Sequence, residues 1–167
     1  NQARLRHLRG RAFLCPGFGA EVFMSEFQYL DSDARQLNRD RLMAALTALN
    51  AVAVEIDYCG GGDSGDVSDF CIQPAELRPL LESETVMLRC KVGRWDDPER
   101  RRESVDRPFS LREALHEFTL DWVDGPHNLW YEGEGGQGSL SIDVPGNRFT
   151  LNHHAFYIES NHYEHVL

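Results

Sequence analysis

The stretch AVAVEIDYCGGGDSGDVSDFCI, residues 51–72, decides the fold expected for this chain. Larger apolar residues stand at every second position of its first part: Val52, Val54, Ile56 and Tyr58. Such alternation is typical of a half-buried β-strand. A second apolar run at 67–72 follows the glycine-rich centre, so the stretch predicts an antiparallel hairpin.

The centre of this hairpin contains GDSG, residues 62–65, which resembles the nucleophile motif of trypsin-like serine proteases. A nucleophilic serine needs a base, and that base needs an orienting group. In that protease class both precede the serine, but only His7 lies upstream of Ser64. Asp66 would also oppose the charge of an oxyanion. We therefore reject a serine protease and interpret the glycines, Asp63 and Ser64 as a wide hairpin loop.

Carboxylates are concentrated along this hairpin. They are Glu55, Asp57, Asp63, Asp66 and Asp69. Glu55 and Asp57 are two residues apart and therefore project from one strand face. A solvated acidic face is the simplest interpretation, whereas clustered oxygen ligands also suit hard cations such as calcium or magnesium. We predict a binding surface from these acids and Ser64, with Trp95 as a further contact residue.

The C-terminal stretch NHHAFYIESNHYEHVL, residues 152–167, is rich in histidine. Imidazole binds zinc and titrates near neutral pH, although polar residues at a strand end are the simpler explanation of the pattern. His153 and His154 are adjacent, so a regular strand would point them to opposite faces. A metal site would combine Asp57, Asp63 and Asp66 with His153 or His154, and it requires the first hairpin and the last strand to be neighbours.

The remaining sequence alternates helical and extended patterns. Leucines at helical spacing predict a helix from Ser32 or Asp33 to about Asn50. Residues 74–83 predict a short helix interrupted by Pro79, and 85–92 a strand. A capping box at Ser110 and Glu113 predicts a helix that ends at 124–126, and a β-meander with a glycine-rich turn follows.

This order of elements predicts an α+β fold: a mainly antiparallel sheet of about five strands with two to three helices packed on one face. Residues 24–167 would form a single domain, with a mobile charged loop at 95–108. Residues 1–23 contain four arginines and one glutamate. We interpret them as an extension upstream of a start at Met24, or alternatively as a basic arm.

Composition limits the classes of function. The chain has 167 residues, 41% of them hydrophobic, and a net charge of −10. This acidity disfavours a nucleic-acid binder, because phosphate contacts need clustered cations. The sequence lacks a membrane-length apolar run, a secretory signal and a CxxC pair. We expect a cytoplasmic protein that does not bind a membrane and needs no cofactor, with a bound divalent metal as the alternative. The sequence does not indicate an oligomeric state.

Two segments resemble a bacterial domain family of unknown function. They are NRDRLMAALTALNAVAVEIDYCGGGDSGDV and NLWYEGEGGQGSLSIDVPGNRFTLNHHAFYIESNHYEH, within residues 36–167. The family pattern is a VEFDG-like strand, GDSG and a C-terminal LDHN-like segment; Cys59 with the glycines 60–62, and the doubled histidine at 153–154, depart from it. The resemblance implies small proteins common in alphaproteobacteria and often encoded on plasmids or mobile elements. It implies no catalytic residue.

Three functions follow from these patterns. The first is a non-enzymatic protein-binding or regulatory module of a mobile element or defence system, in keeping with the acidic hairpin. The second is a metal-dependent hydrolase in which a metal-bound water attacks the substrate. The third is a DNA mimic, which would need carboxylates in a long surface row.

Overall fold

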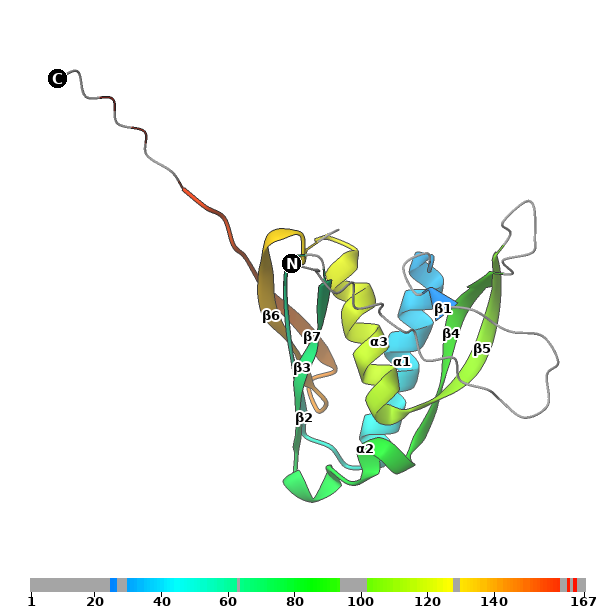
Figure 1. Cartoon of the computed structure of the whole chain (residues 1–167). Helices are drawn as coiled ribbons and strands as arrows, with labels where there is room; N and C mark the ends of the chain where they lie inside the picture. Colours follow the sequence, from blue (N-terminus) through cyan, green and yellow to red (C-terminus); the bar gives the residue numbers. More distant parts are fainter. Residues whose placement is uncertain are drawn as a thin grey trace, which may run out of the picture.

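The computed structural model describes residues 25–26, 30–62, 64–93, 102–127, 130–159, 162 and 164. These residues form two antiparallel sheets (Figure 1). The four-stranded sheet has the order β3-β2-β6-β7, with β2 Ala53–Gly62, β3 Ser64–Gln73, β6 Gly133–Asp143 and β7 Arg148–Ala155. The second sheet has the order β1-β4-β5, with β1 Ser25–Glu26, β4 Thr85–Gly93 and β5 Arg102–Ser110.

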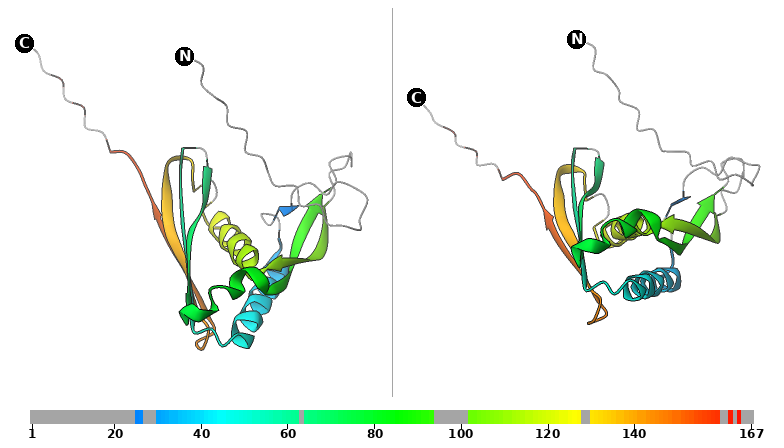
Figure 2. Two further views of the ribbon diagram at one scale, coloured as in Figure 1. Left: turned by 60° about the horizontal axis from the view of Figure 1, so that its bottom comes forward. Right: turned by 90° about the horizontal axis from the view of Figure 1, so that it is seen from below.

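The helices α1 Ser32–Ala48 and α3 Leu111–Asp124 lie between the two sheets (Figures 1 and 2). The short α2, Leu80–Ser83, follows a 3₁₀ turn at Ala75–Leu77. One buried apolar cluster joins both helices to both sheets, and it includes Leu42, Leu46, Ile56, Leu88, Leu115 and Leu140. The predicted α+β class with antiparallel pairing is confirmed, and the strands are divided between two sheets.

Polar contacts fix α1 in this layer. Its first turn is capped by Asp31, which accepts a hydrogen bond from the Ala34 amide at 2.8 Å, and not by Ser32 or Asp33. The side-chain amide of Asn38 bonds both the amide and the carbonyl of Arg89 at 2.7 and 2.8 Å. This pair of bonds ties the middle of α1 to β4.

The predicted capping box begins α3, since Ser110 and Glu113 make both reciprocal hydrogen bonds. Near the end of α3, Asp121 is only 3% exposed and receives two hydrogen bonds from Arg35 of α1, at 2.9 and 3.0 Å. Burial raises the pKa of Asp121, although the Arg35 guanidinium acts in the opposite direction. A buried ion pair therefore joins the two central helices.

The first hairpin is tighter than predicted. β2 continues to Gly62 and β3 begins at Ser64, with Gly61 paired to Ser64, so the expectation of a wide loop is wrong. The glycines belong to paired strands because other parts of the chain pack on them, as described below. Asp63, at the reversal, lies outside the described residues.

The expectation of a loop across 95–108 is wrong from Arg102 onward, where β5 begins. Charged residues in β5 are paired with distant cations: Asp106 accepts hydrogen bonds from Arg41 of α1 and Arg89 of β4 at 2.9–3.1 Å. These bonds hold the pKa of Asp106 well below its usual range. The rest of the expected loop, with Trp95, lies outside the described residues, as do residues 1–23.

Candidate functional site

The candidate site is the outer face of the four-stranded sheet, the face turned away from the helices (Figures 1 and 2). The alternation of β2 determines which side chains lie there. Val54, Ile56 and Tyr58 are buried against the helical layer, whereas Glu55 and Asp57 are exposed on the other side. The outer face of β2 therefore carries two of the five acids that the sequence singled out.

Strand register brings two of these acids together. Asp57 of β2 lies directly opposite Asp69 of β3, and Glu55 lies opposite Cys71. Like charges directly opposite each other destabilise an antiparallel pair. The Asp69 carboxylate accepts a hydrogen bond from the Phe70 amide at 2.8 Å. Within the described part of the chain, neither Asp57 nor Glu55 has an ion-pair partner.

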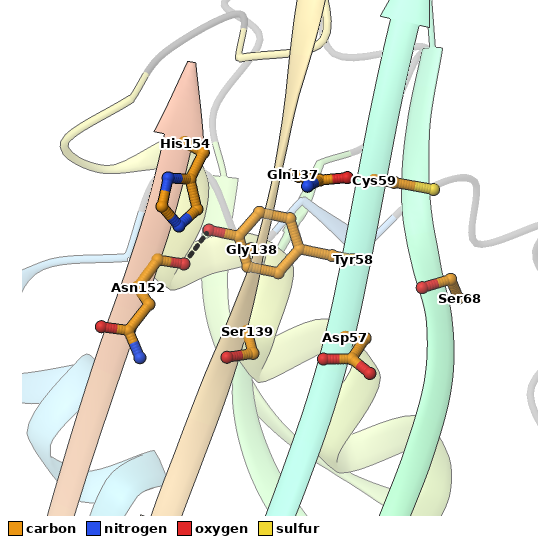
Figure 3. Close-up of a pocket in the computed structure, with 9 residues that line it drawn as sticks. All are labelled: Asp57, Tyr58, Cys59, Ser68, Gln137, Gly138, Ser139, Asn152 and His154. Atoms are coloured by element: carbon orange, nitrogen blue, oxygen red, sulfur yellow. Dashed lines mark hydrogen bonds between the residues drawn. The ribbon is translucent and has the colours of Figure 1, made fainter. Parts of the chain in front are cut away.

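A hollow of about 470 Å³ lies beside Asp57 (Figure 3). Two cross-strand rows border it: Asp57, Ser139 and Asn152 in one, and Cys59, Gln137 and His154 in the other. The hollow therefore reaches from β2 across β6 to β7. Asp57 and His154 line the same hollow, but β6 separates their strands, so the hairpin and the last strand are not direct neighbours as the metal hypothesis required.

Asp66 belongs to a different contact. Its carboxylate lies 2.6 Å from Nε2 of His116 on α3, and it also accepts a bond from the Val67 amide at 2.7 Å. Glu117 lies 3.5 Å from Nδ1 of the same imidazole. The interaction with Glu117 and the bond to Asp66 raise the pKa of His116 against the effect of burial. Asp66 thus connects the hairpin to α3.

Ser64 is exposed near the tip of the hairpin. Among the hydrogen bonds of the described residues, none joins its hydroxyl to an imidazole. Asp66, two residues along the chain, contacts His116, and Ser64 takes no part in this contact.

His153 lies on the opposite face from His154, as strand alternation predicts. Its Nδ1 is 3.0 Å from the Tyr58 hydroxyl, which is also 3.0 Å from the Asn152 carbonyl oxygen. The hydroxyl has one proton, so donation to the carbonyl requires Nδ1–H of His153 to donate to the hydroxyl oxygen. Burial and the stacked ring of His127, 4.1 Å away between centroids, lower the pKa of His153. Burial raises the pKa of Tyr58 to about 12.

Glycines of β2, β3 and β6 make room for this aromatic cluster. A Cβ on Gly65 would collide with the Trp130 ring, and one on Gly60 would lie 2.8 Å from Cζ3 of the same ring. A Cβ on Gly138 would lie 2.7 Å from Cζ of Tyr58, which crosses β6 at this point to reach β7. The second glycine of GDSG is therefore required by packing. Sequence reasoning missed the cluster because nothing local connects Trp130 to position 65.

The described residues contain no group of three or more His, Cys, Asp or Glu side chains placed to hold a metal ion. Of the proposed metal ligands, Asp57 and His154 share the hollow, while Asp66 is bonded to His116 and His153 to Tyr58. Asp63 is outside the described residues. In the same part of the chain, no helix is long and apolar enough to span a membrane.

Fold and site define a class: a small acidic α+β protein with two antiparallel sheets around a helical layer and a polar, helix-free sheet face. The chain belongs to a family of unknown function, DUF6878, whose sequence profile matches residues 34–167. No curated protein and no solved structure shows significant similarity to it. The match confirms the resemblance noted from the hairpin and the C-terminal segment.

Proposed function

We propose that this protein is a binding module that holds a cationic segment of a protein partner on the outer face of its four-stranded sheet. The observation that carries the proposal is the Asp57–Asp69 pair, two exposed carboxylates directly opposite each other on neighbouring strands. Such a pair weakens the hairpin in the free protein. A bound cation would remove the repulsion, so the folded protein favours cationic ligands at this place.

The overall charge supports the same type of partner. The net charge of −10 creates a field that attracts cations and raises their association rate. Other acids of the described residues are paired with arginines, as Asp121 is with Arg35 and Asp106 with Arg41. Glu55, Asp57 and Asp69 remain available on one face.

The hollow favours arginine over lysine. A guanidinium has five donors in a fixed plane and needs several acceptors, whereas an ammonium acts as a compact point charge. The hollow offers the Asp57 carboxylate and the side-chain oxygens of Gln137, Ser139 and Asn152 (Figure 3). A carboxylate combined with neutral acceptors suits a planar group with many donors.

The two other functions receive less support. A metal-dependent hydrolase would have to bring Asp66 and a histidine together with Asp57, but Asp66 contacts α3 at 2.6 Å. A DNA mimic would also bind a cationic protein surface, so it is a special case of the proposed function. It would further need carboxylates in a long row, whereas the outer-face acids form a short cluster on β2 and β3.

The test uses a labelled twelve-residue peptide of alternating arginine and threonine, with a lysine–threonine peptide for comparison. Binding is measured by fluorescence anisotropy for the wild type and the double variant Asp57→Asn/Asp69→Asn. The matched control, Asp40→Asn/Glu76→Gln, removes the same charge from exposed positions on α1 and the 3₁₀ turn.

We expect the site variant to weaken arginine-peptide binding about tenfold and the control less than about twofold, because only the former removes contacts as well as net charge. The arginine peptide should bind more tightly than the lysine peptide. Equal weakening in both double variants would show that only net charge matters and would contradict a site on this face.

A further inference from the structure

We infer that the partner segment binds as an added β-strand along the open edge of β7, with its cationic side chains directed over the outer face. This inference rests on the proposed function for the charge of the partner. It adds the geometry of binding and a second contact, which is apolar. The evidence comes from a difference between the two edges of the four-stranded sheet.

The edge at β3 is protected against pairing. A register shift opposite Asp57 and Tyr58 leaves Ser68 as an extra residue in β3, and such a bulge disrupts strand pairing. Two amides of β3 are occupied by their neighbouring carboxylates: Val67 by Asp66 at 2.7 Å and Phe70 by Asp69 at 2.8 Å. Bulges and acidic side chains are usual means of blocking an edge strand.

The edge at β7 is different. The Phe156 amide donates to the Gly135 carbonyl at 2.9 Å, so the ladder with β6 continues one residue past the strand. In an antiparallel ladder every second residue bonds the partner, which directs the main-chain groups of Leu151, His153 and Ala155 away from β6. No described segment pairs with this side of β7. Its register with β6 is regular, without a bulge.

Three large apolar residues continue the line of β7. Phe156, Tyr157 and Ile158 are 49%, 83% and 72% exposed. The segment that contains them runs away from the body of the protein in an extended path (Figure 1). Consecutive exposed apolar side chains beside an open strand edge are typical of an interaction surface. An added strand would cover part of this apolar surface.

Charge identifies the occupant as a partner strand with basic residues at alternate positions. The near wall of the hollow is formed by Asn152 and His154 of β7 itself, and its far wall includes Asp57. Every second side chain of a strand added to β7 would stand on the outer face beside Asn152 and His154. Asp57, the one acid among the described residues that line the hollow, lies two strands beyond β7 and contributes to the field on this face without a direct contact. The net charge of −10 attracts arginine or lysine at these positions, while acidic residues would be repelled.

The experiment compares the arginine–threonine peptide with two versions that are N-methylated at every second residue, one at the arginines and one at the threonines. A methyl group removes the amide donor. An added strand directs only alternate amides to β7, so one version should bind like the parent peptide and the other at least tenfold more weakly. Amide hydrogen exchange at Leu151, His153 and Ala155 should slow when the parent peptide binds.

Each other outcome is decisive. Equal affinity of both methylated versions with the parent would overturn strand addition and leave a cationic site on the sheet face. Failure of the parent peptide to bind would overturn the proposed function and this inference together. A concentration-dependent dimer that protects the three β7 amides without peptide would assign the edge to a second copy of the chain and overturn the inference.

Discussion

At the scale of single residues, the structure explains why glycine stands at the last position of the GDSG motif. Gly65 faces the Trp130 ring, and the indole Nε1 is held by Asp124 at 2.9 Å. The motif therefore lets a residue more than sixty positions away pack against the hairpin. Its serine stays exposed at the hairpin tip.

This explanation predicts different effects at two glycines of one hairpin. Gly65→Ala should lower the free energy of unfolding by about 1–3 kcal/mol, because the added methyl group overpacks the Trp130 contact. Gly61→Ala is the matched control, since its nearest atom would be the Glu134 carbonyl oxygen at 3.9 Å, an ordinary contact. Urea unfolding measures both. Equal stabilities of the two variants would contradict the packing role.

At this scale, local patterns could be predicted from the sequence, whereas contacts between distant residues could not. The alternation at 54–58 and the capping box at Ser110 and Glu113 are local, and both are confirmed. The side chain of His116, by contrast, is 30% exposed and bonded to Asp66, fifty positions away. That contact arises only from the packing of α3 against β3, so the residues next to His116 in the sequence do not predict it.

At the scale of elements, the Arg35–Asp121 pair holds α1 against α3. The pKa of Asp121 is raised in the folded protein, so its ionised form is disfavoured there. A raised pKa contributes stability that is complete below the ordinary value and is lost as the pH rises through the folded value. Arg35 limits this loss, because the guanidinium stabilises the buried carboxylate.

Arg35→Met should therefore lower the free energy of unfolding by about 2–4 kcal/mol at pH 7, because it leaves a buried carboxylate without its counter-ion. The loss should shrink as the pH falls from 7 through the raised pKa of Asp121, because the protonated carboxyl group needs no counter-ion. The control is Arg35→Met/Asp121→Asn, which has no carboxylate at this position and should show less pH dependence. Denaturant unfolding across this pH range measures both, and a pH-independent loss in the single variant would contradict the account.

Some secondary-structure elements could be predicted from the sequence, and others could not. The first hairpin follows from its period of two, but β5 was hidden by a dense run of charges. Asp106 lies in that run, and its partners Arg41 and Arg89 come from α1 and β4. The start of β6 resembled a turn because of its glycines, although Gly138 serves the packing of Tyr58. The hollow could not be predicted because residues of two hairpins that are distant in the sequence, β2–β3 and β6–β7, line it together.

At the scale of the whole molecule, the two faces of the four-stranded sheet differ in composition. The inner face is apolar and joins the core that both helices share with β4. The outer face is polar and carries carboxylates whose arrangement weakens the free protein. A fold that retains such a pair on an exposed face is consistent with selection for binding at the expense of stability.

The proposed binding role requires Asp57 to be electrostatically unfavourable in the free protein, which can be measured as the stability of the Asp57→Asn variant. Measured by urea unfolding at pH 7 and low salt, this variant should be more stable than the wild type by about 0.5 kcal/mol, because repulsion from Asp69 and Glu55 disappears. Asp40→Asn makes the same charge change on α1, beside Arg39 at 3.5 Å, and should leave stability unchanged or slightly lower. A loss of stability in Asp57→Asn would show that this carboxylate stabilises the fold and would contradict the account.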